Sequence, residues 1–243
     1  MSELRDFVKK IEELTAPETV EIYGATYGKQ DHNLVMVKPP VVEPIRGFGL
    51  NGLVDYLKYN VDCISRGDSI MIHVYDYDQV DIIATYDNHS KVRECYFMAR
   101  PQTPNIKLNQ FVDRERFNIM LQACFVETDI RNEVLSAIGS IVVDNNSGME
   151  VADDGVTQSV EAKSGQVIKT KKTIPNPVAL RPYRTFAELE QPESNFVLRI
   201  NENMDVGLFE ADGGAWKADA REKIKAYLTE QLKDLGIMIA IIV

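Results

Sequence analysis

Three glycines in the stretch RGFGLNGLVD, residues 46–55, have the spacing G-x-G-x-x-G. At this spacing a nucleotide-binding loop lets the backbone approach a pyrophosphate at the start of a helix. Such a site needs a buried strand that ends at the first glycine, but Pro44 and Arg46 occupy the place of its apolar end. The pattern therefore favours a tight turn in which Asn51 caps the following helix. A nucleotide-binding enzyme that uses Gly47–Gly52 stays as an alternative.

The other residue types that do chemistry do not stand in catalytic patterns. The three histidines are far apart without H-E-x-x-H, and neither a Walker loop nor G-x-S-x-G occurs. The acidic stretches at 76–81 and 144–155 lack the glycine and glutamate positions of a calcium loop. Cys63, Cys95 and Cys124 are widely spaced, which predicts buried reduced thiols. We therefore expect no catalytic residue, no metal and no cofactor.

A second glycine pair, Gly213 and Gly214, opens an amphipathic stretch in LFEADGGAWKADAREKIKAYL, residues 208–228. The amides at a helix start bind anions, but Glu210 and Asp212 would repel a phosphate here. We expect the glycines to turn the chain sharply into a helix that Trp216 anchors in the core.

Two arginines and an aromatic residue stand close together in LRPYRTF, at Arg181, Tyr183 and Arg184. Prolines restrict this backbone, so the side chains could hold a carboxylate, a phosphate or a partner chain. They could equally tie the segment to the acidic stretch ELEQPE, residues 188–193, and we favour this structural tie.

The charge balance argues against nucleic acid as a default partner. The 243-residue chain has 27 Lys and Arg against 37 Asp and Glu, a formal net charge of −10. A local basic patch at Lys169, Lys171 and Lys172 fits an exposed strand protected from aggregation. No apolar run reaches the roughly 18 residues of a membrane span, and the first residues are unlike a signal peptide. We expect a cytoplasmic protein without a membrane partner.

The periodicity of apolar residues predicts an α+β fold with antiparallel meanders and segregated helices. An N-terminal helix carries an apolar stripe and should dock on the rest of the chain, and PPVVEPIRG, residues 39–47, should be an extended connector because of its prolines. Further helices and strands are expected as follows: helices at about 51–64, 108–125, 128–142 and 215–235, and strands at 20–24, 33–38, twice within 69–86, at 92–100 and in a hairpin around KSG.

Two domain arrangements follow from these elements. Residues 1–45 form a helix and an extended arm, and residues 46–243 form the main domain, which could divide into lobes at 46–143 and 144–243. The apolar C-terminus GIMIAIIV cannot lie in water, so Ile239 and Ile241 belong either to a core strand or to a surface that another subunit covers.

Several stretches resemble a family of bacteriophage and prophage proteins, the YfdQ-like family. They are DDGVTQSVEAKSGQ, then PNPVALRPYRTFAELEQPESNFVLRI, then LFEADGGAWKADAREKI, and the resemblance is clearest over residues 153–228. It implies a phage-encoded protein in the cytoplasm of an infected or lysogenic bacterial host. It implies no activity and no catalytic residues.

These observations lead to a hypothesis of association. We expect a non-enzymatic phage accessory protein that forms a homo-oligomer or sequesters a host or phage protein, with a shell-like oligomer as one version. The alternative is an accessory factor in phage DNA replication or recombination that binds single-stranded DNA or its protein partners. Clustering of the lysines of residues 169–172 with Arg181 and Arg184 on one surface would favour that alternative.

Overall fold

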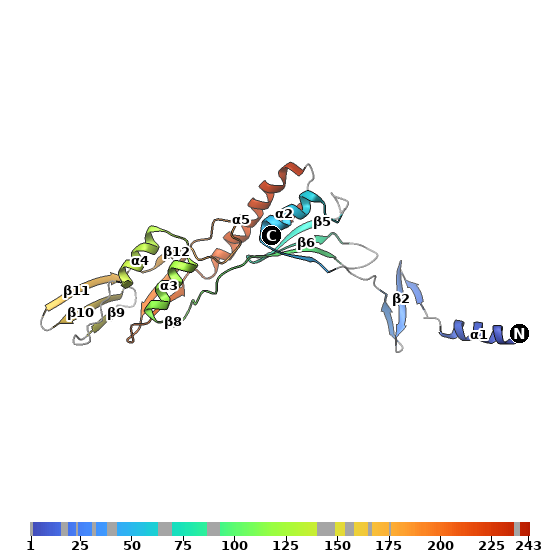
Figure 1. Ribbon diagram of the computed structural model, residues 1–243, viewed down its shortest axis with the longest axis horizontal. Helices are drawn as coiled ribbons and strands as arrows, with labels where there is room; N and C mark the ends of the chain where they lie inside the picture. Colours follow the sequence, from blue (N-terminus) through green and yellow to red (C-terminus); the bar gives the residue numbers. More distant parts are fainter. Residues whose placement is uncertain are drawn as a thin grey trace.

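The computed structural model describes most of the chain and shows an α+β fold, as the sequence predicts. The residues that it describes are 2–15, 19–22, 24–30, 33–37, 43–62, 70–86, 93–139, 149–153, 158–164, 167–174, 176–235 and 239–243. Within these residues the strands form four sheets. Two of them have helices packed on one face and make up the body of the molecule (Figure 1).

The first lobe is a five-stranded mixed sheet in the order β15-β5-β6-β7-β4 with two helices on one face (Figure 1). Its strands are β4 (Ile45–Phe48), β5 (Ile70–Asp76), β6 (Gln79–Ala84), β7 (Cys95–Arg100) and β15 (Ala240–Ile242), and its helices are α2 (Leu50–Tyr59) and α5 (Ala215–Leu232), which continues into the 3₁₀ turn η1 (Lys233–Leu235). Side chains such as Ile72, Ile82 and Phe97 alternate toward the helices and are buried, as expected for strands with one covered face.

The central meander β5-β6-β7 is antiparallel and confirms the sequence prediction, but the two edges of this sheet correct it. Residues 45–48 are a strand, β4, parallel to β7, whereas the sequence predicted an extended connector. The prolines still act as expected, because Pro44 precedes the strand and β4 is an edge. At the other edge β15 pairs in parallel with β5.

The second lobe is a four-stranded sheet in the order β12-β13-β14-β8, packed against two helices. Its elements are β8 (Phe111–Val112), α3 (Arg114–Cys124), α4 (Asp129–Gly139), β12 (Val178–Leu180), β13 (Ser194–Ile200) and β14 (Val206–Glu210). The predicted helix pair is confirmed with later starts. Residues 108–113 are not helical, and the side chain of Asp113 caps α3. β12 lies in the proline-rich stretch PNPVALRPYRTF, residues 175–186, where prolines disfavour a regular strand.

The two lobes do not follow the order of the chain. The first core takes residues 50–57, 70–82 and 97–99, then Phe186 and Leu189, then α5 and β15. The second core takes residues 117–138, 178–180 and 196–208, which alternate along the chain with these pieces. A division at residue 143 therefore does not separate the two cores, because each core combines segments from before and after this residue.

Two smaller sheets lie beyond the lobes, at opposite ends of the molecule (Figure 1). Near the second lobe is an antiparallel sheet that includes the predicted hairpin around KSG: β9 (Met149–Asp153), β10 (Gln158–Ser164) and β11 (Val167–Ile174). At the other end is the N-terminal arm, which we define as residues 2–37. It consists of α1 (Ser2–Thr15), β1 (Thr19–Ile22), β2 (Ala25–Gln30) and β3 (Asn33–Met36).

Candidate functional site

The glycine turn has more of a nucleotide-binding shape than the sequence predicts. β4 ends at Phe48, Gly49 adopts φ 93°, and α2 begins at Leu50. A strand therefore leads into this turn, but it is an exposed edge strand and not the buried strand that a nucleotide site needs, as the sequence predicts. Gly47 is needed for packing, since a Cβ there would lie 2.5 Å from the ring of Phe97.

The carboxylate of Glu188 occupies the start of α2, where a phosphate would bind. The backbone N–H of Asn51 donates to Glu188 Oε1 at 3.1 Å. A Cβ on Gly49 would lie 2.5 Å from the same oxygen, so the glycine makes room for this carboxylate. The sequence predicted that the side chain of Asn51 caps the helix, and this is wrong. The side chain instead accepts a hydrogen bond of 2.6 Å from the hydroxyl of Tyr227. An anion of the protein itself therefore fills the helix terminus.

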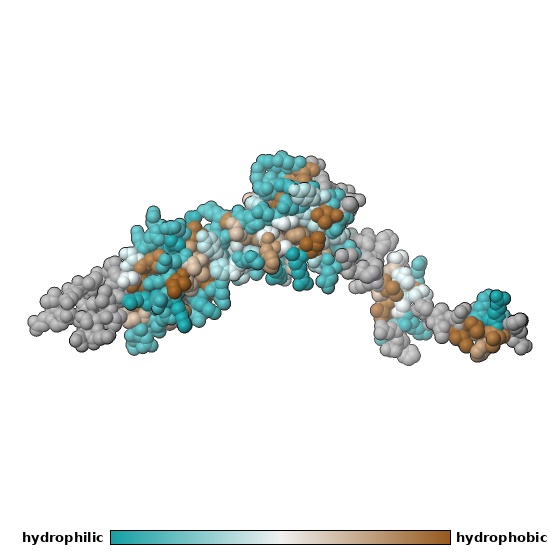
Figure 2. Space-filling view, in the orientation of Figure 1, coloured by the Kyte–Doolittle hydropathy of each residue, from teal (hydrophilic) through white to brown (hydrophobic). Residues whose placement is uncertain are grey.

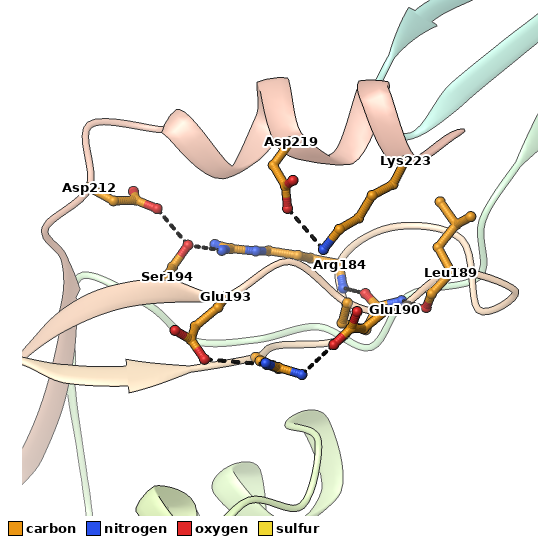
Figure 3. Close-up of polar contacts among 10 residues, drawn as sticks. Arg184, Leu189, Glu190, Glu193, Ser194, Asp212, Asp219 and Lys223 are labelled. Atoms are coloured by element: carbon orange, nitrogen blue, oxygen red, sulfur yellow. Dashed lines mark hydrogen bonds and ion pairs between the residues drawn. The ribbon is translucent and has the colours of Figure 1, made fainter. Parts of the chain in front are cut away.

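Arg184 is a buried joint between the two lobes (Figure 3). Its side chain lies over the ring of Trp216 at 3.7 Å and near Phe196 at 5.8 Å. It donates to Glu210 at 3.0 Å and to Ser194. Burial lowers the pKa of Arg184 to about 10, although Glu210 partly opposes this shift. With 8% of its surface exposed, Arg184 holds the fold together and is closed to a partner.

Arg181 makes the structural tie that the sequence favours. It contacts Glu190 at 2.6 Å and Glu193 at 3.3 Å, both in the acidic stretch ELEQPE (Figure 3). The backbone N–H of Tyr183 donates to the carbonyl of Cys124 at 2.9 Å, while its ring is exposed. The structure thus separates the two arginines: one lies at the surface, and the other lies in the interior. The side chains of the lysines of residues 169–172 lie outside what the structure describes.

A polar cavity of about 390 Å³ lies between this segment and α5. Asp212 accepts from Ser194 Oγ at 2.5 Å and from the N–H of Gly214 at 3.0 Å, and Lys223 pairs with Asp219 at 3.0 Å (Figure 3). Burial pushes the pKa of Asp212 upward, but the hydrogen bonds from Ser194 and Gly214 outweigh it, so the net shift is downward. The charged side chains that line the cavity are therefore engaged by partners within the protein, and the arrangement stabilises the turn into α5.

The turn into α5 and its anchor are as the sequence predicts. Gly213 and Gly214 have φ values of 62° and 82°, in the region that favours glycine. Trp216 is 6% exposed and packs edge-on against Tyr77 with ring centroids 4.6 Å apart. These residues fix the position of α5 on the first lobe.

The C-terminal candidates lie against the protein's own core. Ile239 and Ile241 are partly buried and pack on the first lobe, and Ile241 pairs with Ile72 across the β15-β5 edge. Ile242 and Val243 remain exposed. Of the two options that the sequence leaves open for the apolar C-terminus, the structure shows a strand that belongs to the sheet.

The N-terminal helix presents its apolar side to solvent. Leu4, Phe7, Val8 and Ile11 are 72%, 62%, 48% and 44% exposed. We call these four residues the apolar stripe. In Figure 2 hydrophobic residues cover one side of α1 at the end of the molecule. The helix was predicted to dock on its own chain, and instead α1 lies away from both lobes (Figure 1).

The neighbouring sheet of the arm is also apolar on its surface. Val20, Leu34, Val35 and Val37 are exposed there, and hydrophobic side chains are visible over this sheet in Figure 2. Exposed apolar patches larger than a few hundred Å² are rare on monomeric proteins and mark interaction surfaces. The arm is therefore the strongest candidate site for an interaction.

A second apolar surface, which sequence reasoning missed, lies on α3. A groove of about 550 Å³ runs along this helix, and its apolar lining includes Phe111, Ile119, Met120 and Ala123. We call it the α3 groove. Phe117 and Leu121 face the core, so the signal in the sequence was an isoleucine, Ile119, on the wrong side of a helix for core packing.

Comparisons with known proteins add no relative. No family model matches the chain, and no curated protein or solved structure is detectably similar to it. The resemblance to the YfdQ-like family stays a prediction. Among the described residues, no helix is long and apolar enough to span a membrane, and no group of three His, Cys, Asp or Glu side chains is placed to hold a metal ion.

Proposed function

We propose that this protein is a non-enzymatic, self-associating protein, and that the N-terminal arm makes the association. The observation that carries the proposal is the exposure of the apolar stripe on a helix that packs on neither lobe. Amphipathic helices in proteins gain most of their stability from packing of the apolar face. A 14-residue helix with this face in water therefore requires a partner surface.

The residues that suggested chemistry support the non-catalytic part of the proposal. Arg184, Arg181 and Asp212 hold the lobes and the turn into α5, and Glu188 closes the helix terminus at the glycine turn. Each of these charged groups is used in the protein's own structure. The resemblance to phage and prophage proteins supports a place in the cytoplasm of an infected or lysogenic bacterium, where an oligomer could enclose or sequester a host or phage component.

Sedimentation velocity on three chains tests this proposal. The wild type should sediment above the monomer mass of 27.5 kDa. Phe7→Asp puts a charge into the apolar stripe and should give a folded monomer, because a buried carboxylate without a partner is strongly disfavoured. The matched control Lys9→Asp puts the same carboxylate on the polar side of α1 and should sediment like the wild type.

The outcomes separate the arm from other causes of association. A wild type that stays at 27.5 kDa would contradict self-association. An oligomer that Phe7→Asp leaves intact would assign the association to another surface. Circular dichroism of the three chains checks that the lobes remain folded.

A further inference from the structure

We propose that the apolar stripe of α1 packs into the α3 groove of a second copy of this chain, and that two copies exchange their arms reciprocally. This inference rests on the proposed function, because it names the acceptor surface for the arm. It draws on three features of the described residues: the spacing of the side chains, the place of the two surfaces in the molecule and the area they offer.

The two helix faces have the same spacing. The stripe residues Leu4, Phe7, Val8 and Ile11 stand at i, i+3, i+4 and i+7, and the groove takes residues 116, 119, 120 and 123 of α3 at the same steps. Each face spans eight residues, that is seven steps or roughly 10 Å at 1.5 Å per residue. Helices pack through ridges of side chains at these steps, so the two faces suit a helix–helix contact.

The groove offers an apolar centre and a polar edge. Ile119 is 59% exposed and Phe111 is 42% exposed, while Ala123 is small enough to let another helix approach closely. Asp113 and Arg116 lie at the edge and pair with each other at 3.1 Å. An interface with an apolar centre and a charged rim is the usual anatomy of a protein contact.

The place of the two surfaces indicates a second copy. α1 and α3 lie toward opposite ends of the elongated chain, with the five-stranded sheet between them (Figure 1). The arm as placed therefore does not reach the α3 groove of its own chain. Two copies lying side by side in opposite directions bring each arm to the partner's groove, which is the geometry of a two-fold pair.

The area favours reciprocal exchange over a single contact. At about 100 Å² for each exposed apolar side chain, the stripe offers roughly 400 Å², so one arm in one groove buries about 800 Å² from both sides. That is the size of a weak contact, whereas two such contacts reach about 1,600 Å², the standard size of a stable interface. A closed pair therefore buries enough area for a stable interface, whereas a single docked arm does not.

Site-specific cross-linking between two differently tagged chains tests the contact. One chain carries Phe7→Cys and the other carries Ile119→Cys. In both chains the native thiols are removed by Cys63→Ser, Cys95→Ser and Cys124→Ser. After mixing, a short bismaleimide should join the two tags in one covalent product. The matched control, Lys9→Cys in place of Phe7→Cys, should give at least tenfold less product.

A chain that carries both Phe7→Cys and Ile119→Cys tests reciprocity. The account expects a doubly linked closed dimer at twice 27.5 kDa and no longer ladder. A ladder of higher products would overturn the reciprocal pair, and linkage within one chain would show that the arm folds back.

Failure of this proposal is distinguishable from failure of the proposed function. If the mixed chains sediment as an oligomer but Phe7→Cys and Ile119→Cys give no joined product, the α3 groove is wrong and self-association stands. If the native chains sediment at 27.5 kDa, both proposals fail.

Discussion

Two amphipathic helices at different places in this chain have opposite outcomes. α5 buries its stripe from Trp216 to Leu232 against the five-stranded sheet and α2. α1 has a stripe of the same kind, and its side chains are exposed. An amphipathic pattern therefore indicates that a helix needs a partner surface, but it does not say that this surface belongs to the same chain.

The two helices differ in the segments that lie next to them in the chain and in the contacts that they make. Gly213 and Gly214 turn α5 directly back onto the sheet, and Arg184 holds its first turn through Trp216. α1 is followed by the small sheet β1-β2-β3, which extends away from the lobes (Figure 1). Substitutions in α5 should therefore affect folding of the chain, and substitutions in α1 should affect association.

The largest expected effect is that of Trp216→Ala. Removal of this buried ring leaves a cavity beside Arg184 and Tyr77 and should lower the free energy of unfolding by roughly 3–5 kcal/mol. Urea denaturation followed by circular dichroism measures the change. Tyr59→Ala removes an exposed aromatic ring and serves as the control, with an expected change within about 0.5 kcal/mol. Equal effects in the two variants would show that Trp216 is not an anchor.

A smaller loss is expected for Arg184→Met. The change leaves Glu210 without its partner inside the joint between the lobes. A buried pair broken on one side typically costs about 3–5 kcal/mol, and we expect about 2–3 because Glu210 can reach water. Arg181→Met breaks ion pairs at the surface and should cost less than about 1 kcal/mol by the same denaturation assay. A larger loss of unfolding free energy in Arg181→Met than in Arg184→Met would show that Arg181, and not Arg184, joins the two lobes.

Asp81→Asn should stabilise the protein, and the effect should depend on pH. Burial raises the pKa of Asp81, and Oδ1 has no hydrogen-bond partner, whereas Oδ2 accepts from Gln79 at 2.8 Å. The charged carboxylate therefore weakens the folded state at neutral pH, and this cost disappears as pH falls through the raised pKa toward the ordinary value of 3.8.

Thermal unfolding at two pH values measures this effect. The variant should melt above the wild type at pH 7, and the difference should shrink as pH falls toward 4 and the wild-type carboxyl takes up a proton. Asp78→Asn changes a carboxylate in the adjoining turn for which no such gain is expected. A variant that melts below the wild type at pH 7 would show that the charge of Asp81 is stabilising, through His73 or Arg100.

Substitution in the arm should have the smallest effect on stability. Phe7→Asp should leave the unfolding free energy of the lobes within about 0.5 kcal/mol in a monomeric sample, since the side chain contacts neither core. Denaturation of Phe7→Asp and wild type at low protein concentration compares the two. A loss of several kcal/mol would place α1 in the fold of its own chain.

Salt should separate association from nucleic acid binding. Copies with a net charge of −10 repel each other, and salt screens that repulsion, so apolar association should strengthen as ionic strength rises. Binding to single-stranded DNA would weaken instead, because salt competes for the phosphates. Sedimentation at two salt concentrations, with and without an oligonucleotide, measures both trends. An oligomer that dissociates in salt would contradict an apolar interface.

Local patterns in the sequence predicted the elements that depend on near neighbours. The period of α5, the meander from Ile70 to Arg100 and the hairpin around KSG were all correct. The parallel strand pairs at the two edges of the five-stranded sheet were not predicted. β15 pairs with a strand far away in the chain, and a short apolar run does not indicate which strand it will pair with. The same limit applies to Glu188, which caps a helix 137 residues away at Asn51.

The candidate site was predicted only in part. The stripe on α1 was visible as a helical period, but exposure depends on where the rest of the chain lies. The tie between Arg181 and its acidic neighbours was predicted because the partners are close in sequence. Arg184 belongs to the same motif, and its burial depends on Trp216, which approaches only when the two lobes meet.

The absolute mass of the native wild-type protein, measured by light scattering after size-exclusion chromatography over a range of concentrations, tests the central claim most directly. The account predicts a mass of at least twice 27.5 kDa that persists on dilution into the micromolar range. A homogeneous mass of 27.5 kDa at the highest concentration would contradict it, and the apolar stripe would then have to be covered by a partner other than this chain.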